Sequence, residues 1–338
     1  MRFAWKRGHT VAAVSAGVAA AAIGIGVAVS GPAAGPTPAA SSSSAPAGQT
    51  PTPTPAPTPK PRPTDFLTGG KVSGNEVIAV KIENIAAARP QVGLRQADIV
   101  FVEEVEGAQT RLIAVYHTAF PSRLGPVRSA RSTDVRLLPL FGKPGLVYSG
   151  ANRNVQGKIQ RASIVPVERS TRDRRRVAPH NVFVDLERIA ATTGAGRARD
   201  IGWTFATSDP RWQGAAKSSR PAATVGADRF TFDRRDGRYL VRWRGQAYRD
   251  GDDGKLTVCD NVIVMAVRNR GDGNADVNGA RSVLSETVGR GKVTVYRDGR
   301  RLTGTWSRAS VSAPLRFTDS SGRDIPLASG RTWVLLQG

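Results

Sequence analysis

Two strands that are apolar on both faces constrain the fold of this chain more than any other feature. Residues 99–105 (IVFVEEV) and 112–116 (LIAVY) are rich in β-branched and aromatic side chains, which favour strands. The short segment Gly107-Ala108-Gln109 between them predicts a hairpin. Because strands that are apolar on both faces are buried on both sides, we predict that this hairpin lies at the centre of a sheet with helices or loops covering both faces.

The residues around this hairpin predict a fold with both strands and helices. A strand is predicted at 77–82 and another at 145–149, and helical patterns follow at 127–138 and 152–161. From about residue 222 the pattern changes to short strands separated by Asp-Gly and Ser-Gly turns. We therefore predict an α+β fold, in which an N-terminal α/β-type domain with a mixed central sheet (66–218) precedes a mainly-β C-terminal domain (219–338).

The first 65 residues predict export. Basic residues precede an uncharged run at 11–29, so residues 1–30 fit a signal peptide or an N-terminal membrane anchor. Residues 31–65 consist almost entirely of Pro, Ala, Ser, Thr and Gly, which predicts a disordered linker. We expect an extracytoplasmic protein of the cell envelope, either anchored in the membrane by the uncleaved N-terminal helix or secreted.

Polar residues gather at one end of the hairpin and at two later segments. Three acids and an arginine lie at the hairpin, a basic segment follows Gly125-Pro126, and an arginine-rich segment occupies 168–181. These residue types suit a ligand that carries phosphate or carboxylate, although ion pairs of purely structural value are an equally open interpretation. The candidate ligand-binding residues are Glu103, Glu104, Glu106, Arg111, Arg128, Ser129, Arg131, Arg172, His180 and Asn181.

The predicted helix at 127–138 adds a geometric expectation. Residues three apart lie on one face of a helix, so Arg128 and Arg131 are expected to point the same way. The start of such a helix also offers free backbone N–H groups to an anion. We therefore expect at least two of Arg111, Arg128 and Arg131 to face a common cleft at the end of the sheet.

Several motifs, in the same order, resemble the YerB-like family of bacterial cell-envelope proteins. They are GLRQADIV at 93–100, EEVEG at 103–107, GPVRSAR at 125–131, APHN at 178–181, GTW at 304–306 and GRTWV at 330–334. The resemblance covers roughly residues 77–338 and implies two domains of unknown function. Many members carry a lipobox cysteine after the apolar run, and this chain has none there. We therefore expect that it is not a lipoprotein.

Charge and cysteine content narrow the classes of function. With 49 Lys and Arg against 27 Asp and Glu, the net charge of +22 favours anionic partners, unless it only reflects an arginine-rich coding background. Export disfavours nucleic acid as the partner. The single cysteine, Cys259, allows no intramolecular disulfide and is expected to be a buried thiol. No cofactor motif or metal-ligand spacing is present, so we predict neither a cofactor nor a metal.

Three functions are compatible with these features. The first is an envelope protein that binds an anionic wall polymer or similar ligand through arginines of the N-terminal domain. The second is an enzyme acting on a phosphate-linked or acidic wall polymer, for which the sequence assigns no catalytic residue. The third is a scaffold that binds another envelope protein.

Overall fold

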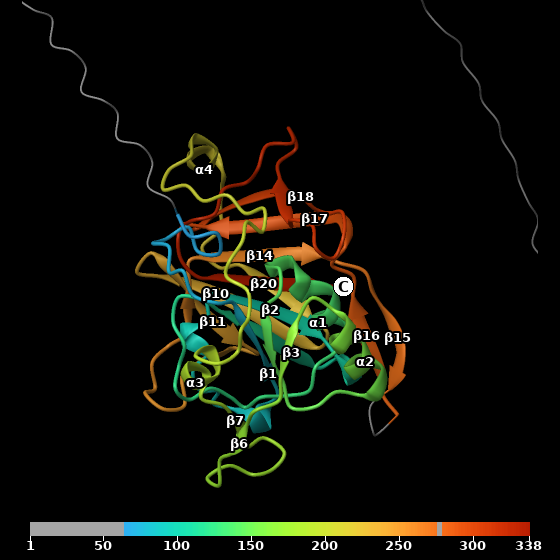
Figure 1. Ribbon diagram of the computed structural model, residues 1–338. Coiled ribbons are helices and arrows are strands. Elements are labelled where there is room, and N and C mark those ends of the chain that lie inside the picture. The colour runs from blue at the N-terminus through green and yellow to red at the C-terminus, as the bar shows by residue number, and fades with distance from the viewer. Residues whose placement is uncertain (1–63, 276–278) are drawn as a thin grey trace, which may run out of the picture. The chain divides into compact units, whose positions relative to one another are not determined.

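The apolar hairpin lies inside a large mixed sheet. The computed structural model describes residues 64–275 and 279–338. Within these residues the sheet has eleven strands, including β8 (Ala216–Lys217), which pairs with β18 (Figure 1). The other strands lie in the order β19 (Arg316–Thr318), β18 (Arg300–Arg308), β17 (Gly289–Arg297), β14 (Asn261–Ala266), β20 (Thr332–Gln337), β2 (Ile99–Glu104), β3 (Thr110–Tyr116), β1 (Ile78–Glu83), β4 (Gly145–Val147) and β5 (Val165–Val167).

The sheet joins the two halves of the sequence. Strand β2 pairs with β3 in the antiparallel sense and, on its other edge, with β20 in the parallel sense, where Ile99 lies opposite Thr332. Strand β20 also pairs in parallel with β14, whereas β1 is antiparallel to β3 and parallel to β4. The sheet is thus mixed, and the predicted α+β fold is confirmed. Strands from both sides of the predicted boundary at residues 218 and 219 share this sheet, and the boundary itself stays a prediction.

Both faces of the hairpin are covered, as its apolar character predicts. Along β2, Ile99 and Phe101 contact one core, and Val100 and Val102 contact the other, because successive strand residues point to opposite faces. The first core is covered by α1 (Ser132–Leu137), α2 (Arg153–Arg161), α4 (Pro210–Gly214) and the 3₁₀ helix η4 (Leu138–Phe141).

A smaller sheet covers the second core. Its strands are β12 (Gln246–Ala247), β11 (Arg238–Trp243), β10 (Asp228–Arg235), β9 (Ala222–Val225) and β13 (Val258–Cys259). Phe232 of this sheet meets Trp333 of β20 with ring centroids 6.1 Å apart. The Cys259 thiol is fully buried in the same core, as expected.

Short elements complete the described chain. Helix α3 (Leu186–Ala190) packs against the second core through Leu186 and Ile189. The remaining elements are the 3₁₀ helices η1 (Ala86–Ala88), η2 (Leu94–Gln96) and η3 (Glu106–Ala108) and the strand pairs β6 (Thr171–Arg172) with β7 (Val182–Phe183) and β15 (Asn269–Ala275) with β16 (Arg281–Ser285).

The helix predicted at 127–138 is shorter than expected. It begins only at Ser132, because the preceding segment is extended and pairs with its neighbours. The Arg128 N–H donates to the Lys81 carbonyl at 2.8 Å, and the Ala130 N–H donates to the Gly150 carbonyl at 3.0 Å. Arg128 and Arg131 therefore do not share a helix face.

The predicted export segment and all but the end of the predicted linker fall outside the described residues. Those predictions concern residues 1–30 and 31–65, and the structure describes the chain from Thr64 onward. In the described part, no helix has both the length and the apolar character needed to cross a membrane.

Candidate functional site

Charged residues of three neighbouring strands share one face at one end of the main sheet. Arg111 of β3 lies opposite Glu83 of β1 and opposite Glu103 of β2. Opposed residues in antiparallel strands point to the same face. Further along the strands this face carries Phe101 and Ile113, which belong to the core under α1 and α2. The charged cluster thus forms where the first core ends.

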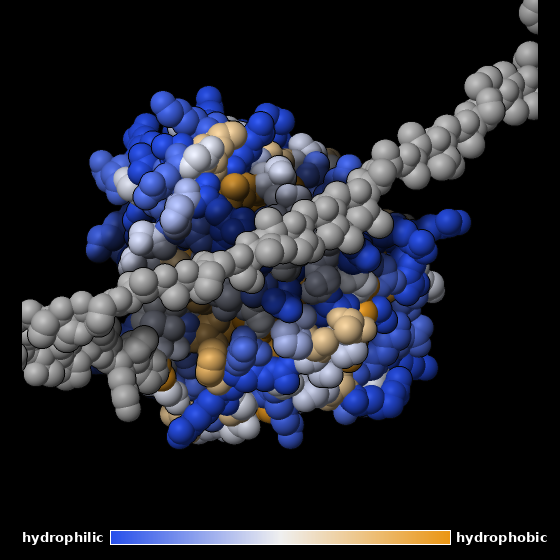
Figure 2. All heavy atoms as spheres, turned by 90° about the horizontal axis from the view of Figure 1, so that it is seen from above, coloured by the Kyte–Doolittle hydropathy of each residue, from blue (hydrophilic) through white to orange (hydrophobic). Residues whose placement is uncertain are grey.

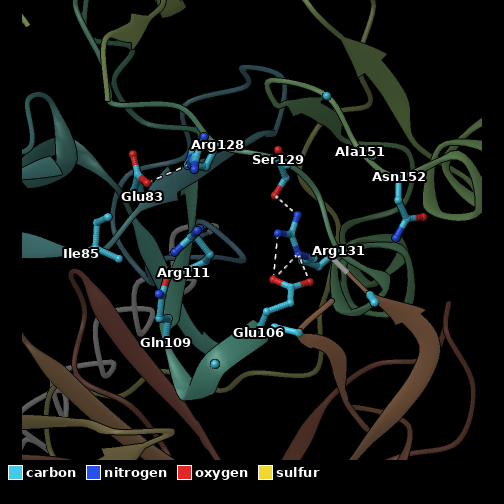
Figure 3. Close-up of a pocket in the computed structure, with 14 residues that line it drawn as sticks. Glu83, Ile85, Glu106, Gln109, Arg111, Arg128, Ser129, Arg131, Ala151 and Asn152 are labelled. Carbon is cyan, nitrogen blue, oxygen red and sulfur yellow. Dashed lines mark hydrogen bonds and ion pairs between the residues drawn. The ribbon is translucent and has the colours of Figure 1, made fainter. Parts of the chain in front are cut away.

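A cavity of about 750 Å³ lies at this end of the sheet, and two ion pairs line it (Figure 3). Arg131 donates from Nε and Nη2 to Glu106 Oε2 at 2.9 and 2.8 Å. Arg128 Nε lies 2.8 Å from Glu83 Oε1, but the N–H is not aligned with that oxygen, so the contact is an ion pair without a hydrogen bond. We call this space the Arg111 cavity, after the arginine that lies between the two pairs.

The segments before α1 and after β2 position the Arg131–Glu106 pair at the cavity. Arg131 is the N-cap of α1, and its backbone N–H donates to Asp134 Oδ2 at 2.6 Å. Glu106 begins the 3₁₀ helix that closes the hairpin. Burial alone would raise the pKa of Glu106, but the hydrogen bonds and charge of Arg131 outweigh burial and lower it.

Arg111 differs from its two neighbours because it has no carboxylate partner among the described residues. Its side chain is 5 % exposed and donates from Nη1 to the Thr110 carbonyl at 3.1 Å. Among residues 64–275 and 279–338, no acid lies within ion-pair distance of Arg111, and its Nε has no hydrogen-bond acceptor. Burial lowers the pKa of Arg111 to about 10; the charge of Glu83 opposes this shift, and Arg128 and Arg131 add to it.

A second charged cluster lies deeper on the same face and does not line the cavity. Lys81 donates to both oxygens of Asp134 at 2.8 Å and also to Glu103, and all three side chains are fully buried. We call these three residues the buried triad. Burial raises the pKa of Glu103 to about 7, although the Lys81 charge lowers it and the Asp134 charge raises it further.

The arginine-rich segment 168–181 contacts Glu83, a residue of the cavity wall. His180 Nδ1 lies 2.9 Å from Glu83 Oε2, and because a carboxylate only accepts, the imidazole N–H is the donor. Arg172 donates to Asn181 Oδ1 at 3.1 Å. Glu83 therefore contacts two segments that are far apart in sequence, through Arg128 and through His180.

The structure brings together some of the predicted site residues and separates others. Glu106, Arg111, Arg128, Ser129 and Arg131 line the Arg111 cavity, so the expectation that two of the three arginines face one cleft is met. Glu103 lies in the buried triad, and Glu104 accepts from Asn269 of β15 at 2.7 Å. Their roles as ligand-binding residues stay predictions. No group of three or more His, Cys, Asp or Glu side chains in the described chain is arranged to hold a metal ion.

Sequence reasoning missed Glu83, Lys81 and Asp134. Glu83 directly follows the strand predicted at 77–82, and the strand pattern assigns it no role. Its importance follows from strand register, which places it opposite Arg111 across 28 positions of sequence that the pattern alone does not pair. A lysine and a glutamate in otherwise apolar strands were the available signal, since buried charges are paired.

The helix start expected near residue 127 does not supply free backbone N–H groups to the cavity: α1 begins at Ser132, which does not line it. The first turn of α1 belongs to a helix of six residues, and the Arg131 N–H that precedes it already binds Asp134. An anion in the cavity would therefore meet guanidinium groups rather than the start of a helix.

Comparisons with known proteins decide the family. Residues 67–199 match the family model "Protein of unknown function (DUF3048) N-terminal domain", and residues 220–334 match the corresponding C-terminal domain. The chain belongs to the DUF3048 family. This result confirms the resemblance to YerB-like proteins, because the chain is also 25% identical over 297 residues to the "Putative lipoprotein YerB" of Bacillus subtilis (strain 168), covering 80% of this chain and 84% of that protein.

A solved structure supports the same fold for this DUF3048 protein. The crystal structure of the YerB protein from Bacillus subtilis superposes with a TM-score of 0.66 at 21% identity, covering 81% of this chain and 96% of that chain. The relationship to YerB supports an envelope protein of unknown function.

One prediction is overturned by the same relationship. The missing lipobox cysteine led to the expectation that the chain is not a lipoprotein, whereas the related protein carries the name "Putative lipoprotein YerB", at 25% identity. The expectation was wrong: it rested only on the absence of a cysteine after the apolar run, in residues that the structure does not describe.

Proposed function

We propose that this DUF3048 protein binds an anionic envelope ligand, carrying phosphate or carboxylate, in the Arg111 cavity. The observation that carries the proposal is Arg111 itself: a guanidinium that is 5 % exposed, lines a cavity and has no acidic partner in the described chain. A buried charge without a partner is costly, and buried charges in proteins are normally paired. An anion in the cavity would supply the missing partner.

The neighbouring ion pairs support an anion rather than a cation as the ligand. Glu83 and Glu106 are already matched by Arg128 and Arg131, so among the described wall residues Arg111 leaves one positive charge in excess. Guanidinium groups match the oxygens of phosphate and carboxylate in a two-pronged geometry. The rival interpretation, that the arginines only neutralise the acids, describes Arg128 and Arg131 but not Arg111.

The face seen in Figure 2 is compatible with a polar ligand. In the view of Figure 2, the described residues are mostly hydrophilic, and apolar residues occur only in small scattered areas. With a net charge of +22 the protein attracts anionic polymers over a wide area, and the cavity offers one place where a single anionic group can be desolvated. The proposed partner is therefore an anionic wall polymer or a precursor that carries the same groups.

Substitution of Arg111 tests this proposal. The purified 338-residue chain is titrated with inorganic phosphate and with citrate, one for each class of anion, by NMR or calorimetry. Arg111→Met, which keeps an unbranched side chain, should weaken the tighter interaction by about tenfold or more, equivalent to about 1.4 kcal/mol. Arg316→Gln on β19 is the matched control, because Arg316 pairs with Asp324 away from the cavity. Equal binding by wild type and Arg111→Met would contradict the proposal.

A second candidate function is an enzyme acting on a phosphate-linked or acidic wall polymer. It is favoured by the His180–Glu83 contact of 2.9 Å, because a carboxylate that accepts from Nδ1 orients an imidazole so that Nε2 can act as a base. Glu83 lines the Arg111 cavity, so this pair borders the place proposed for the anionic group. Turnover of a wall polymer that His180→Asn abolishes, with binding retained, would establish the enzyme over the binding protein.

A further inference from the structure

A second cavity adjoins the Arg111 cavity. Its volume is about 340 Å³, and it shares two wall residues with the first, Arg128 and Gly150. The other walls come from the strand end at Tyr148 and from the arginine-rich segment, which supplies Glu168 and Arg172. We call this space the Glu168 cavity.

One of the two shared wall residues, Gly150, has a backbone conformation that favours glycine. Gly150 has a φ of +81°, in the left-handed region that other residues rarely adopt. A Cβ at this position would meet no atom within 4 Å, so it would project into open space. Gly150 therefore adds no side chain to the wall that the two cavities share.

The Glu168 cavity differs from its neighbour in the charges that remain unpaired. Glu168 Oε1 accepts from Tyr148 Oη at 2.7 Å and from Gln156 Nε2 at 3.0 Å. In the described part of the chain, no cation pairs with Glu168, and its Oε2 has no hydrogen-bond donor. Arg172 donates to Asn181 and likewise has no acidic partner there. The wall therefore offers a free carboxylate oxygen as acceptor and a guanidinium as donor.

We infer that the two cavities form one groove, in which the Arg111 cavity holds an anionic group and the Glu168 cavity holds an adjacent uncharged unit rich in hydroxyl groups. This inference rests on the proposed function. A carboxylate accepts hydrogen bonds from hydroxyl groups, whereas it repels a second anion. Donors and acceptors that alternate along a wall suit a sugar or another polyol, in which each hydroxyl both donates and accepts. The ligand class is thus a sugar or polyol phosphate, or an acidic sugar.

Arg128 occupies the position that this arrangement requires. It lines both cavities and lies against Glu83, so it can contact the oxygen that links an anionic group to its neighbour. Its side chain is 27 % exposed, so its N–H groups are accessible from the groove.

Two probes and two variants test the groove. Inorganic phosphate fills only the proposed anionic position, whereas glucose 1-phosphate adds a hydroxylated unit. The wild-type chain should bind glucose 1-phosphate about tenfold more tightly than inorganic phosphate. In Glu168→Ala this ratio should fall to about one, while inorganic phosphate binds at least as tightly as before. Glu187→Ala removes an exposed acid from α3 and should keep the wild-type ratio. Arg172→Gln should lower the ratio as well.

The outcomes separate the inference from the proposed function. If inorganic phosphate binds in an Arg111-dependent manner, but glucose 1-phosphate binds no better or its advantage survives in both Glu168→Ala and Arg172→Gln, the groove is overturned and the proposed function stands. If neither of these probes nor citrate binds in an Arg111-dependent manner, the proposed function fails and the groove fails with it.

Discussion

Two charged clusters on the same face of the main sheet differ in how their charges are compensated. The buried triad places Lys81 between Glu103 and Asp134, sealed from solvent under α1. The Arg111 cavity matches Arg128 with Glu83 and Arg131 with Glu106, and leaves Arg111 without an acid in the described chain. One cluster is closed and has an acid in excess, and the other lines a cavity and has a cation in excess.

The difference separates a structural role from a binding role. In the buried triad every charged group has a partner within the protein, so removal of one partner must leave another buried charge uncompensated. In the cavity the unpaired group is a donor that an external anion can reach. The sequence alone does not distinguish the two clusters, because in both of them acidic and basic residues occur among apolar residues.

The largest expected effect comes from breaking the buried triad. Lys81→Met leaves Glu103 and Asp134 buried without a counter-charge, which should lower the free energy of unfolding by about 3–5 kcal/mol. Urea denaturation followed by tryptophan fluorescence measures this change. Lys255→Met, at an exposed residue, is the control and should change stability by less than about 0.5 kcal/mol. A loss below about 1 kcal/mol for Lys81→Met would show that the triad is not a structural unit.

A smaller effect distinguishes the arginines of the cavity from each other. Arg131→Met leaves Glu106 without its partner, and because these side chains are 14% and 8% exposed, the cost should be about 2 kcal/mol rather than that of a fully buried pair. Arg111→Met removes a cation that has no acidic partner, so the free energy of unfolding should fall by less than about 0.5 kcal/mol or rise. Thermal denaturation of both variants measures the difference. Similar losses would contradict the claim that Arg111 is unpaired.

An effect of comparable size is a pH dependence that belongs to the buried triad. The pKa of Glu103 is raised to about 7, so the folded state binds this proton more tightly than the unfolded state does. Stability contributed by Glu103 is therefore complete below its ordinary pKa near 4.5 and is lost as pH rises toward 7, by about 1–3 kcal/mol. Glu103→Gln should remove this decline, measured as the difference between the stability curves of variant and wild type from pH 4 to 8. Parallel curves would contradict the raised pKa.

The fold was largely predictable because the apolar pattern of each strand can be recognised in the local sequence. The double-sided apolar pattern at 99–116 predicted a central hairpin, and β2 and β3 occupy the interior of the sheet. The helix at 127–138 was overestimated, because the backbone of Arg128 and Ala130 pairs with Lys81 and Gly150 instead. These hydrogen bonds join segments that are distant in sequence, so they cannot be predicted from the helical propensity of residues 127–138.

The candidate site was predictable only in part. Arg111, Arg128 and Arg131 were expected to face one cleft because Arg128 and Arg131 are three apart in a predicted helix. All three line one cavity, but Arg128 lies in an extended segment before α1, so the helical argument for their placement was wrong. Glu83 was not recognised, because its place opposite Arg111 depends on the register of β1 against β3. Glu103 and Glu104 are neighbours in sequence but lie on opposite faces of β2, so only one joins the charged face.

The sequence by itself determined the family, the fold class and the residue types of the site, because motifs and strand patterns are local properties of the chain. The tertiary structure decided which charges are paired. Whether an arginine is neutralised depends on distances of a few ångströms between segments as remote as Arg128, Glu83 and His180. Electrostatic energy varies with such distances and with burial, and neither is encoded in the spacing of residues along the chain.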